Sequence, residues 1–399
     1  MLRRMSESAA RTDVQAHRAT ADRVAIRRTL LARTDSVVVK VGTNVLSGAD
    51  DRIDTECIES LAESLAAIRS TGRRVVLVSS GSIGIGLGLM GLVERPSELP
   101  QLQAAASLGQ ARLISTYDKA LERWGLHASQ ILLTANDFKD RARYLNTRNT
   151  LSALASIDCI PIVNENDTVS IKGITLGDND RLASLVTSLM PSPLLVILTT
   201  ADGLLNGPPS NPASRRIPVV RDWNDDVRAV VSDEGSSRGT GGMRSKLDAV
   251  RMAVEVGETV IVADGRKSDT LERILRGDDV GTLFEGRPQS MPAWKRWIAQ
   301  AVPPGGTLRI NAGAAQAVVR DGRSLLAVGV EGVDGQFDRG DVVAVVGPDG
   351  PLARGLVNYD SDDSRRLAGR NSSEFADLVG SCSYRELIHR DNLVLVDSD

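Results

Sequence analysis

Hydrophobic residues between positions 36 and 285 fall into short, nearly continuous runs that alternate with longer stretches of helical periodicity. Continuous apolar runs of this length are typical of strands that are buried on both faces of a parallel sheet. The runs read SVVVKV, RRVVLVS, SQILLT, CIPIVN, PLLVILT and ETVIVAD. The alternation predicts an α/β fold, a three-layer sandwich around a mainly parallel sheet with right-handed crossovers.

The first stretch between two such runs shows the helical pattern. Apolar residues recur three or four positions apart from Ile58 to Ile68, which places them on one face of a helix. Asp54 or Thr55 is a suitable N-cap, and Gly72 is a suitable end. We therefore expect a helix here that packs one face against the sheet.

The pattern changes near residue 286. The stretch EGRPQSMPAWKRWIAQAVPPGG, residues 285–306, is rich in proline and glycine around Trp294 and Trp297, which favours a linker. The segments TLRINAG, AAQAVV, SLLAVGV and GDVVAVVGPDGPLARGLV then resemble short strands separated by turns, with GPDG as a hairpin signal. The sequence predicts an N-terminal extension over 1–34, an α/β domain over 35–286, a linker over 287–303 and a small β-rich domain over 304–392.

Composition narrows the functional classes. The formal net charge of −3 and the pI near 5.8 argue against a protein that mainly coats nucleic acid. Cys57, Cys159 and Cys382 are far apart in the sequence, so neither a disulfide framework nor a zinc site is indicated and a reducing, cytoplasmic compartment is expected. The sequence shows neither an apolar run of about 18 residues nor a signal peptide. We expect residues 1–34 to be a frayed extension with a helix near VAIRRTLLAR.

Polar residues follow several of the predicted strands, where ligands bind in open α/β sheets. Lys40 lies inside the first run, and a lysine buried there without a partner would be costly. Ser80 and Gly81 form the turn after the second run and can present donors to a carboxylate or a phosphate. We therefore assign functional roles to Lys40 and to this turn.

A Gly-x-Gly-x-x-Gly match at Gly86, Gly88 and Gly91 lies several residues beyond the second strand. A dinucleotide site needs these glycines in the first turn after the strand. Close packing of a glycine-rich helix or loop is the better interpretation.

A cluster of acids follows the fourth run. Glu165, Asp167, Asp178 and Asp180 are interleaved with asparagines in NENDTVS and LGDNDRLAS. A helix N-cap explains one of these side chains but not four carboxylates. Such a cluster is expected to hold a substrate ammonium, a magnesium nucleotide or paired lysines.

The segment GTGGMRSK, residues 239–246, precedes another helical pattern. Its glycines and lysine suggest an anion site built on backbone amides, but the spacing is not that of a P-loop. Lys40 and Lys246 are expected to approach one edge of the sheet opposite the acidic cluster. Two lysines in that position can neutralise charge on a transferring phosphoryl group.

Taken in order, the motifs VVVKVGTNVL, VSSGSI, YLNTRNTL, PIVNENDTVS, GDNDRLASL and GTGGMRSKLDAV resemble the amino acid kinase family, most closely its members that phosphorylate glutamate. The resemblance covers residues 36 to 390. It implies ATP-dependent phosphorylation of the γ-carboxylate of L-glutamate, the first step of proline biosynthesis, with Mg²⁺ on the phosphates. It also implies that the β-rich domain is a PUA domain, a module often associated with RNA.

The resemblance also implies roles for individual residues. Lys40 and Lys246 would stabilise the transferring group, Asp180 would orient both lysines, and the residues that bind glutamate would be Ser80, Asp167 and Asn179, with Asp167 on the α-ammonium. The residues that contact ATP would be Lys40, Thr199, Thr200, Thr240, Gly241, Gly242, Met243, Arg244, Ser245 and Lys246. Thr200 stands where the family commonly has an aspartate, which puts the contacts to the nucleotide at this position in question.

The same resemblance implies proline as a feedback inhibitor and a homo-oligomer, dimer or tetramer. A carboxylate is already deprotonated at neutral pH, so the reaction needs no general base, which suits a chain with only three histidines. Two alternatives compete: another amino acid kinase, acting on N-acetylglutamate, aspartate or a carbamate, and an RNA-binding protein with an inactive kinase fold.

Overall fold

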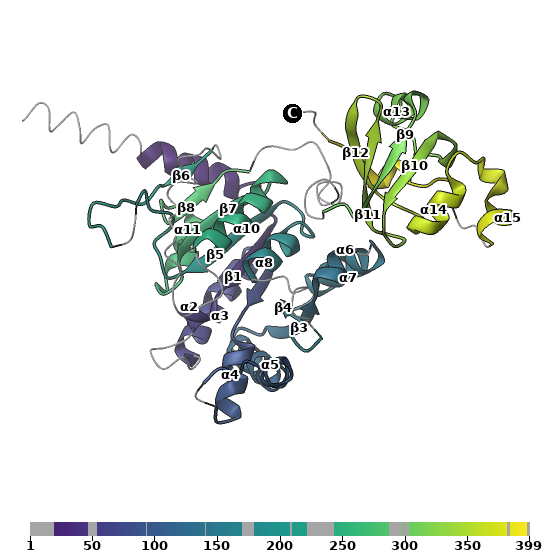
Figure 1. Cartoon of the computed structure of the whole chain (residues 1–399). Coiled ribbons are helices and arrows are strands. Elements are labelled where there is room, and N and C mark those ends of the chain that lie inside the picture. Colours follow the sequence, from purple (N-terminus) through teal and green to yellow (C-terminus); the bar gives the residue numbers. More distant parts are fainter. Residues whose placement is uncertain are drawn as a thin grey trace, which may run out of the picture. The chain divides into compact units, whose positions relative to one another are not determined.

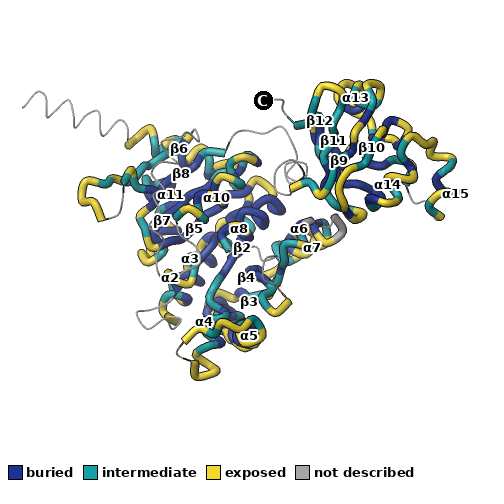
Figure 2. The backbone as a smooth tube through the Cα atoms, in the orientation of Figure 1, coloured by how far each residue is buried: buried dark blue, intermediate teal, exposed yellow. Residues whose placement is uncertain are grey.

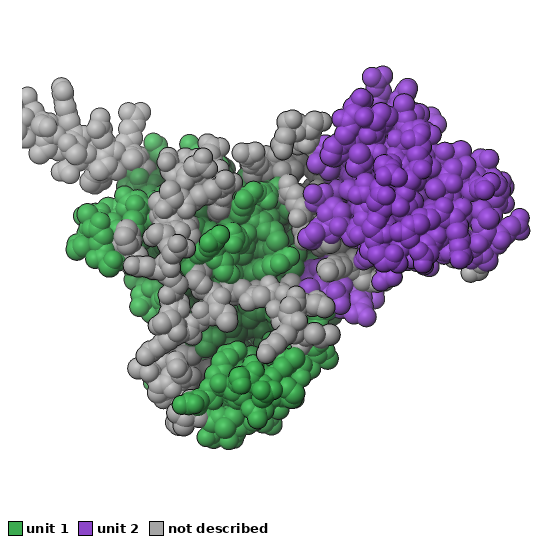
Figure 3. Space-filling model, in the orientation of Figure 1, with its two compact units in different colours: residues 1–134, 150–287 green, residues 135–149, 288–399 purple. Residues whose placement is uncertain are grey.

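The computed structural model describes residues 20–46, 54–92, 94–139, 141–169, 179–207, 210–221, 243–286, 298, 303–380 and 384–396. Asp178, residues 240–242 and nearly all of the expected linker lie outside these ranges. The chain divides into two compact units (Figure 3). The first comprises Met1–Thr134 and Thr150–Arg287, and the second comprises Ala135–Asn149 and Pro288–Asp399.

The described part of the first unit contains an eight-stranded sheet in the order β3-β4-β2-β1-β5-β7-β8-β6 (Figure 1). Neighbouring strands run parallel except β7 and β8, which are antiparallel. The strands are β1 Ser36–Val41, β2 Arg74–Ser79, β3 His127–Leu133, β4 Cys159–Glu165, β5 Pro193–Thr199, β6 Val219–Val220, β7 Thr259–Asp264 and β8 Thr282–Phe284. All six strands predicted for this region are present, and the prediction of a mainly parallel sheet is confirmed. The short strands β6 and β8 were not predicted.

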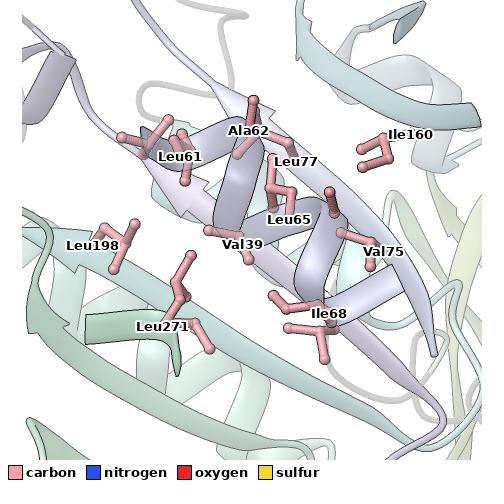
Figure 4. Close-up of a cluster of buried hydrophobic side chains, with 14 of the residues drawn as sticks. Val39, Leu61, Ala62, Leu65, Ile68, Val75, Leu77, Ile160, Leu198 and Leu271 are labelled. Atoms are coloured by element: carbon pink, nitrogen blue, oxygen red, sulfur yellow. The ribbon is translucent and has the colours of Figure 1, made fainter. Parts of the chain in front are cut away.

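Helices of the first unit cover the sheet on both faces. They are α2 Thr43–Leu46, α3 Thr55–Ser70, α4 Ser82–Leu89, α5 Leu99–Glu122, α8 Asn179–Thr187, α10 Met243–Glu255 and α11 Thr270–Arg276. Val37, Val39 and Val41 of β1 share a core with the apolar faces of α3, α5 and α11. Figure 4 shows part of this core, including Val39 of β1, Leu65 of α3 and Leu271 of α11. Because side chains alternate along a strand, Lys40 points to the opposite face, where α8 packs on β1 and β5.

Helix α3 begins and ends as its sequence predicts. The Asp54 carboxylate accepts hydrogen bonds from the backbone N–H groups of Glu56 and Cys57, at 2.9 and 3.3 Å. Gly72 follows the helix with a φ of 83°, a conformation that glycine adopts without strain. The apolar residues of α3 are buried against the sheet, as predicted (Figure 2).

The glycine-rich stretch after β2 forms helix α4, whose packing requires glycine. A Cβ atom at Gly86 would lie 1.8 Å from the carbonyl oxygen of Ala105 on α5. A Cβ atom at Gly109 would lie 1.7 Å from the carbonyl oxygen of Ser82 on α4. These two glycines let the backbones of α4 and α5 touch, which agrees with the packing interpretation.

Residues 20–31 are helical, as expected for VAIRRTLLAR, but this helix is anchored rather than frayed. Leu31 belongs to the core of the first unit. Arg27 is 2% exposed and donates hydrogen bonds from Nη2 to the carbonyl oxygens of Pro218 and Gly281. Burial lowers the pKa of Arg27 to about 10, against the favourable charge of Asp279.

The second unit contains a sheet in the order β10-β9-β11-β12-β13, with its own core. The strands are β9 Gly306–Ile310, β10 Val330–Gly335, β11 Val342–Gly347, β12 Gly350–Leu356 and β13 Leu393–Leu395. β9 and β11 are parallel, and the other neighbours are antiparallel. The unit's helices are α6 Ala135–Lys139, most of α7 Arg141–Leu154, α13 Ala312–Val319, α14 Ser361–Leu367 and α15 Phe375–Val379.

Two strand predictions in this unit are wrong. AAQAVV lies in helix α13, because alanine favours helix and Asn311 caps it by accepting a hydrogen bond from the backbone N–H of Ala314 at 2.9 Å. In SLLAVGV, a 3₁₀ turn over Ala327–Gly329 comes first and strand β10 begins only at Val330. The hairpin predicted at GPDG is present between β11 and β12.

Candidate active site

Two lysines share one buried carboxylate at the carboxyl edge of the large sheet. Lys40 is 2% exposed, and its Nζ lies 2.6 Å from Oδ1 of Asp180, which is fully buried on α8. The Nζ of Lys246 donates a hydrogen bond to Oδ2 of the same carboxylate at 3.0 Å. The partner that a lysine inside SVVVKV requires is therefore Asp180.

The elements that carry these groups are fixed by packing. Helix α8 lies on β1, β2, β4 and β5, and α10 packs beside α8. The Ser184 hydroxyl donates a hydrogen bond to the carbonyl oxygen of Ala249 at 2.7 Å, which joins the two helices. Lys246 lies in the first turn of α10, so its ammonium group reaches the first residues of α8.

Electrostatics keep the central carboxylate ionised. Burial by itself raises the pKa of Asp180, but the ammonium groups of Lys40 and Lys246 outweigh it and hold that pKa below its usual value. The cluster thus contains two cations and one anion.

A network of amides and hydroxyls lies beside the lysines, after β2 and β4. Nδ2 of Asn179 donates hydrogen bonds to Oγ of Ser80 at 2.7 Å, to Oδ1 of Asn164 at 2.9 Å and to the carbonyl oxygen of Ser79 at 3.2 Å. The structure therefore brings Ser80 and Asn179 together, although 99 positions separate them in the sequence.

Asp167 follows β4 at the same edge of the sheet and is half-buried. Burial and the nearby Glu165 carboxylate raise its pKa to about 6, against the opposing effect of Arg95. A carboxylate in this environment gains more from a cationic ligand than an exposed one does.

The residues expected to contact a nucleotide are only partly described. Thr199 is the last residue of β5 and is buried, while Thr200 directly after it is exposed. Met243, Arg244 and Ser245 form the first turn of α10 together with Lys246. The remaining three, Thr240, Gly241 and Gly242, lie outside the described residues.

No role in the site was predicted for Gln110 or Ser82, which both contact Asn164 of this network. Nδ2 of Asn164 donates hydrogen bonds to Oε1 of Gln110 at 2.9 Å and to Oγ of Ser82 at 3.2 Å. A signal was available, because Gln110 shares the buried face of α5 with Leu113 and Tyr117 at helical spacing. A polar residue on such a face requires a partner.

The described residues contain no group of three or more histidine, cysteine, aspartate or glutamate side chains that could hold a metal ion. Asp180 is already shared by two lysines. This set of donors fits a magnesium ion that is held mainly by the phosphates of a nucleotide, the usual mode for Mg²⁺, rather than by a cage of protein ligands.

The fold and the site define an α/β protein with a cluster of two lysines and one aspartate at the carboxyl edge of a mainly parallel sheet. The chain belongs to the amino acid kinase family, whose profile matches residues 35–264. Residues 306–379 match the PUA domain. Within the described residues, no helix is both long and apolar enough to cross a membrane.

Several curated proteins named glutamate 5-kinase are similar to this chain. The protein from Rhodopirellula baltica is 43% identical over 378 residues, which cover 94% of this chain and 97% of the relative. The protein from Moorella thermoacetica is 40% identical over 371 residues, covering 92% and 98%. The protein from Syntrophus aciditrophicus is 42% identical over 372 residues, covering 93% and 96%. The similarity therefore extends over both units.

Proposed function

We propose that this chain transfers the γ-phosphoryl group of ATP to the γ-carboxylate of L-glutamate. An oxygen of the γ-carboxylate forms a bond to the γ-phosphorus, and the bond from that phosphorus to the β,γ-bridging oxygen breaks. The products are γ-glutamyl phosphate and ADP. The observation that carries the proposal is the Asp180 carboxylate that Lys40 and Lys246 share, beside the hydrogen-bonded pair of Ser80 and Asn179. Relatives that match this chain over nearly their full length are named for this reaction.

The lysines act on the phosphoryl group. Negative charge shifts on to the oxygens of the phosphoryl group and the leaving ADP as the reaction proceeds, and two fixed ammonium groups stabilise that charge more than they stabilise the ground state. Asp180 holds both ammonium groups in place, at 2.6 Å from Lys40 and 3.0 Å from Lys246. The site therefore needs little reorganisation during transfer.

The substrate is held at the other side of the cluster. Asp167 pairs with the α-ammonium of glutamate, while Ser80 and Asn179 orient its polar groups by hydrogen bonds. The γ-carboxylate is ionised at neutral pH and attacks directly, so this chemistry needs no protein base.

ATP lies along the ends of β5 and α10. Thr199, Thr200 and the segment 240–246, including Met243, Arg244 and Ser245, contact the nucleotide. When bound with ATP, Mg²⁺ would shield the charge of the phosphates. Thr200 offers a neutral hydroxyl, which donates and accepts, in place of the charged carboxylate that the family resemblance leads us to expect, so its contacts with the nucleotide differ from those of a carboxylate.

The wider role follows from the same reaction. γ-Glutamyl phosphate formation is the first step of proline biosynthesis, and proline, which shares the α-carboxylate and ammonium of glutamate, inhibits by occupying the anchoring end of the site. The kinase domain spans 35–286 and the PUA domain 304–392, and the PUA domain offers a contact to RNA. The chain acts in the cytoplasm as a homo-oligomer.

An assay of hydroxamate formation tests the proposed reaction. The chain is incubated with MgATP, hydroxylamine and one acid at a time: L-glutamate, N-acetyl-L-glutamate, L-aspartate or carbamate. We expect hydroxamate with L-glutamate, and little with N-acetyl-L-glutamate because it lacks the α-ammonium that Asp167 binds. Preference for another acid would assign the chain to a different amino acid kinase, and RNA binding without ATP turnover would indicate an inactive kinase fold.

A further inference from the structure

A directional chain of amides runs from the interior of the first unit to the proposed glutamate site. Gln110 of α5 accepts a hydrogen bond from Asn164 of β4, and Asn164 accepts one from Asn179 of α8. Asn179 in turn donates to Ser80. Gln110 lies at the opposite end of this chain from Ser80, and both Gln110 and Asn164 are buried, at 6% and 2% exposed.

Two backbone contacts show which end of each asparagine amide is its NH₂ group. The N–H of Glu165 can only donate, and it donates to Oδ1 of Asn164 at 2.9 Å. The carbonyl oxygen of Ser79 can only accept, and it accepts from Nδ2 of Asn179 at 3.2 Å. The NH₂ group of Asn164 therefore faces Gln110, and the NH₂ group of Asn179 faces the protein.

The orientation of these amides determines which hydrogen-bonding groups face the proposed substrate. With its NH₂ group turned inward, Asn179 presents its amide oxygen as the remaining hydrogen-bonding group. Oγ of Ser80 accepts from Asn179, so its own hydroxyl proton is available to a carboxylate. Reversal of Asn164 would place its NH₂ group against the N–H of Glu165 and the NH₂ of Asn179, which is unfavourable because all three groups are donors.

Helix packing brings Gln110 within reach of Asn164. Gly109 lets α5 approach the start of α4 so closely that a Cβ atom there would lie 1.7 Å from the carbonyl oxygen of Ser82. Oγ of Ser82 and Oε1 of Gln110 then both accept from Nδ2 of Asn164. The close approach thus places two acceptors beneath one amide.

A glutamine at position 110 lowers the stability of the folded chain relative to an apolar residue. Its Nε2 is buried with no hydrogen-bond partner among the described residues, and an unsatisfied buried amide costs free energy. An apolar side chain would avoid that cost and would fill the same space. The contact that sets glutamine apart from an apolar residue is the one from Asn164 to Oε1.

We propose that Gln110 is a positioning residue for the glutamate site: its Oε1 holds Asn164, which in turn sets the orientation of Asn179 and the polarity of Ser80. This inference rests on the proposed glutamate kinase activity. Gln110 does not touch the substrate, so its loss acts on glutamate binding through the amide chain and leaves the lysine cluster in place.

Steady-state kinetics of three variants test the inference. Gln110→Met keeps the side-chain volume but removes the hydrogen-bond acceptor. We expect this variant to raise the KM for glutamate about tenfold, because a tenfold change corresponds to the loss of about one oriented hydrogen bond. The KM for ATP should stay within about twofold of wild type. Gln110→Glu keeps an acceptor oxygen, since burial favours the neutral acid, and should bring the KM for glutamate back to within about threefold of wild type, an approximate range consistent with a retained acceptor.

Tyr117→Phe is the matched control, because it removes a buried hydroxyl from the same helix. That hydroxyl lies 2.9 Å from Oγ of Ser79, which also bonds to the carbonyl oxygen of Ser80 and so keeps a partner. We expect both KM values of this variant to match wild type.

Two results would overturn the role of Gln110 in a chain whose wild type phosphorylates glutamate. One is a KM for glutamate within twofold of wild type in a folded Gln110→Met variant, and the other is an equal rise in both KM values. If Gln110→Met does not fold, as judged by its melting transition, Gln110→Glu decides, since a tenfold higher KM for glutamate in that variant contradicts the acceptor role. A wild type that consumes ATP without dependence on glutamate would overturn the proposed function and this inference together.

Discussion

Replacement of Lys246 by alanine tests the role of the lysine cluster. Lys246 Nζ lies 3.0 Å from Asp180 Oδ2, and its side chain is 12% exposed. Two unit charges about 4 Å apart interact by about 4 kcal/mol at an effective dielectric constant of about 20. If about two thirds of a charge accumulates near this ammonium group during transfer, the loss is about 2.7 kcal/mol, or about 100-fold in kcat.

The fold should survive this change. Asp180 keeps Lys40 as a partner at 2.6 Å, so the variant leaves no buried carboxylate uncompensated, the situation that would be strongly destabilising. We expect a melting temperature within a few degrees of wild type, because ordinary single substitutions cost about 1 kcal/mol.

Arg251→Ala is the matched control for Lys246→Ala, since it removes one positive charge from the exposed side of the same helix, where Arg251 pairs with Glu255. The assay is ATP consumption at saturating glutamate, with kcat and both KM values determined. A kcat near that of wild type in Lys246→Ala would refute the reasoning. A raised KM for ATP with unchanged kcat would restrict Lys246 to ground-state binding.

Four further outcomes are expected. Asp167→Asn should raise the KM for glutamate far more than the KM for ATP, and equal rises would give Asp167 a structural role. In the wild type, the pKa of Asp167 is raised to about 6, so this carboxylate loses its charge as the pH falls through 6. The kcat/KM for glutamate, measured from pH 8 to 5, should therefore decline near pH 6. A flat profile in that window would contradict the contact between Asp167 and the α-ammonium. Gly86→Ala should lower the free energy of unfolding by about 1–3 kcal/mol in urea titrations, because the new Cβ meets the backbone of Ala105; an unchanged midpoint would show that α4 and α5 separate freely. Proline should raise the apparent KM for glutamate without changing kcat at saturating glutamate, and a lower kcat would exclude simple competition.

The sequence predicts those parts of the site that can be recognised from the order of polar and apolar residues within one segment. A lysine inside an otherwise apolar run needs a partner, and the structure supplies Asp180, the member of the acidic cluster that lies at the start of α8. Ser80 and Asn179 were expected at one edge because both follow parallel strands, and they lie 2.7 Å apart. The alternation of strands and helices was sufficient to predict the large sheet.

Other features depend on contacts between distant parts of the chain. Gln110 and Asn164 are 54 positions apart, so the pattern of α5 can show that Gln110 needs a partner but cannot identify Asn164 as that partner. The segment AAQAVV has apolar residues in an order that fits either a strand or a helix, and the cap at Asn311 decides for helix. The strands β6 and β8 have two and three residues, too few for a periodic signal.

The origin of one oxygen atom tests the central claim, that the γ-carboxylate of glutamate is the phosphoryl acceptor. L-Glutamate labelled with ¹⁸O in its γ-carboxylate is incubated with MgATP and the chain, and hydroxylamine then cleaves the acyl phosphate at carbon. Phosphorus NMR of the released phosphate distinguishes labelled from unlabelled product. We predict phosphate that carries one ¹⁸O atom, because the attacking carboxylate oxygen stays bonded to phosphorus. Release of unlabelled phosphate, as expected when water attacks ATP, would contradict the account.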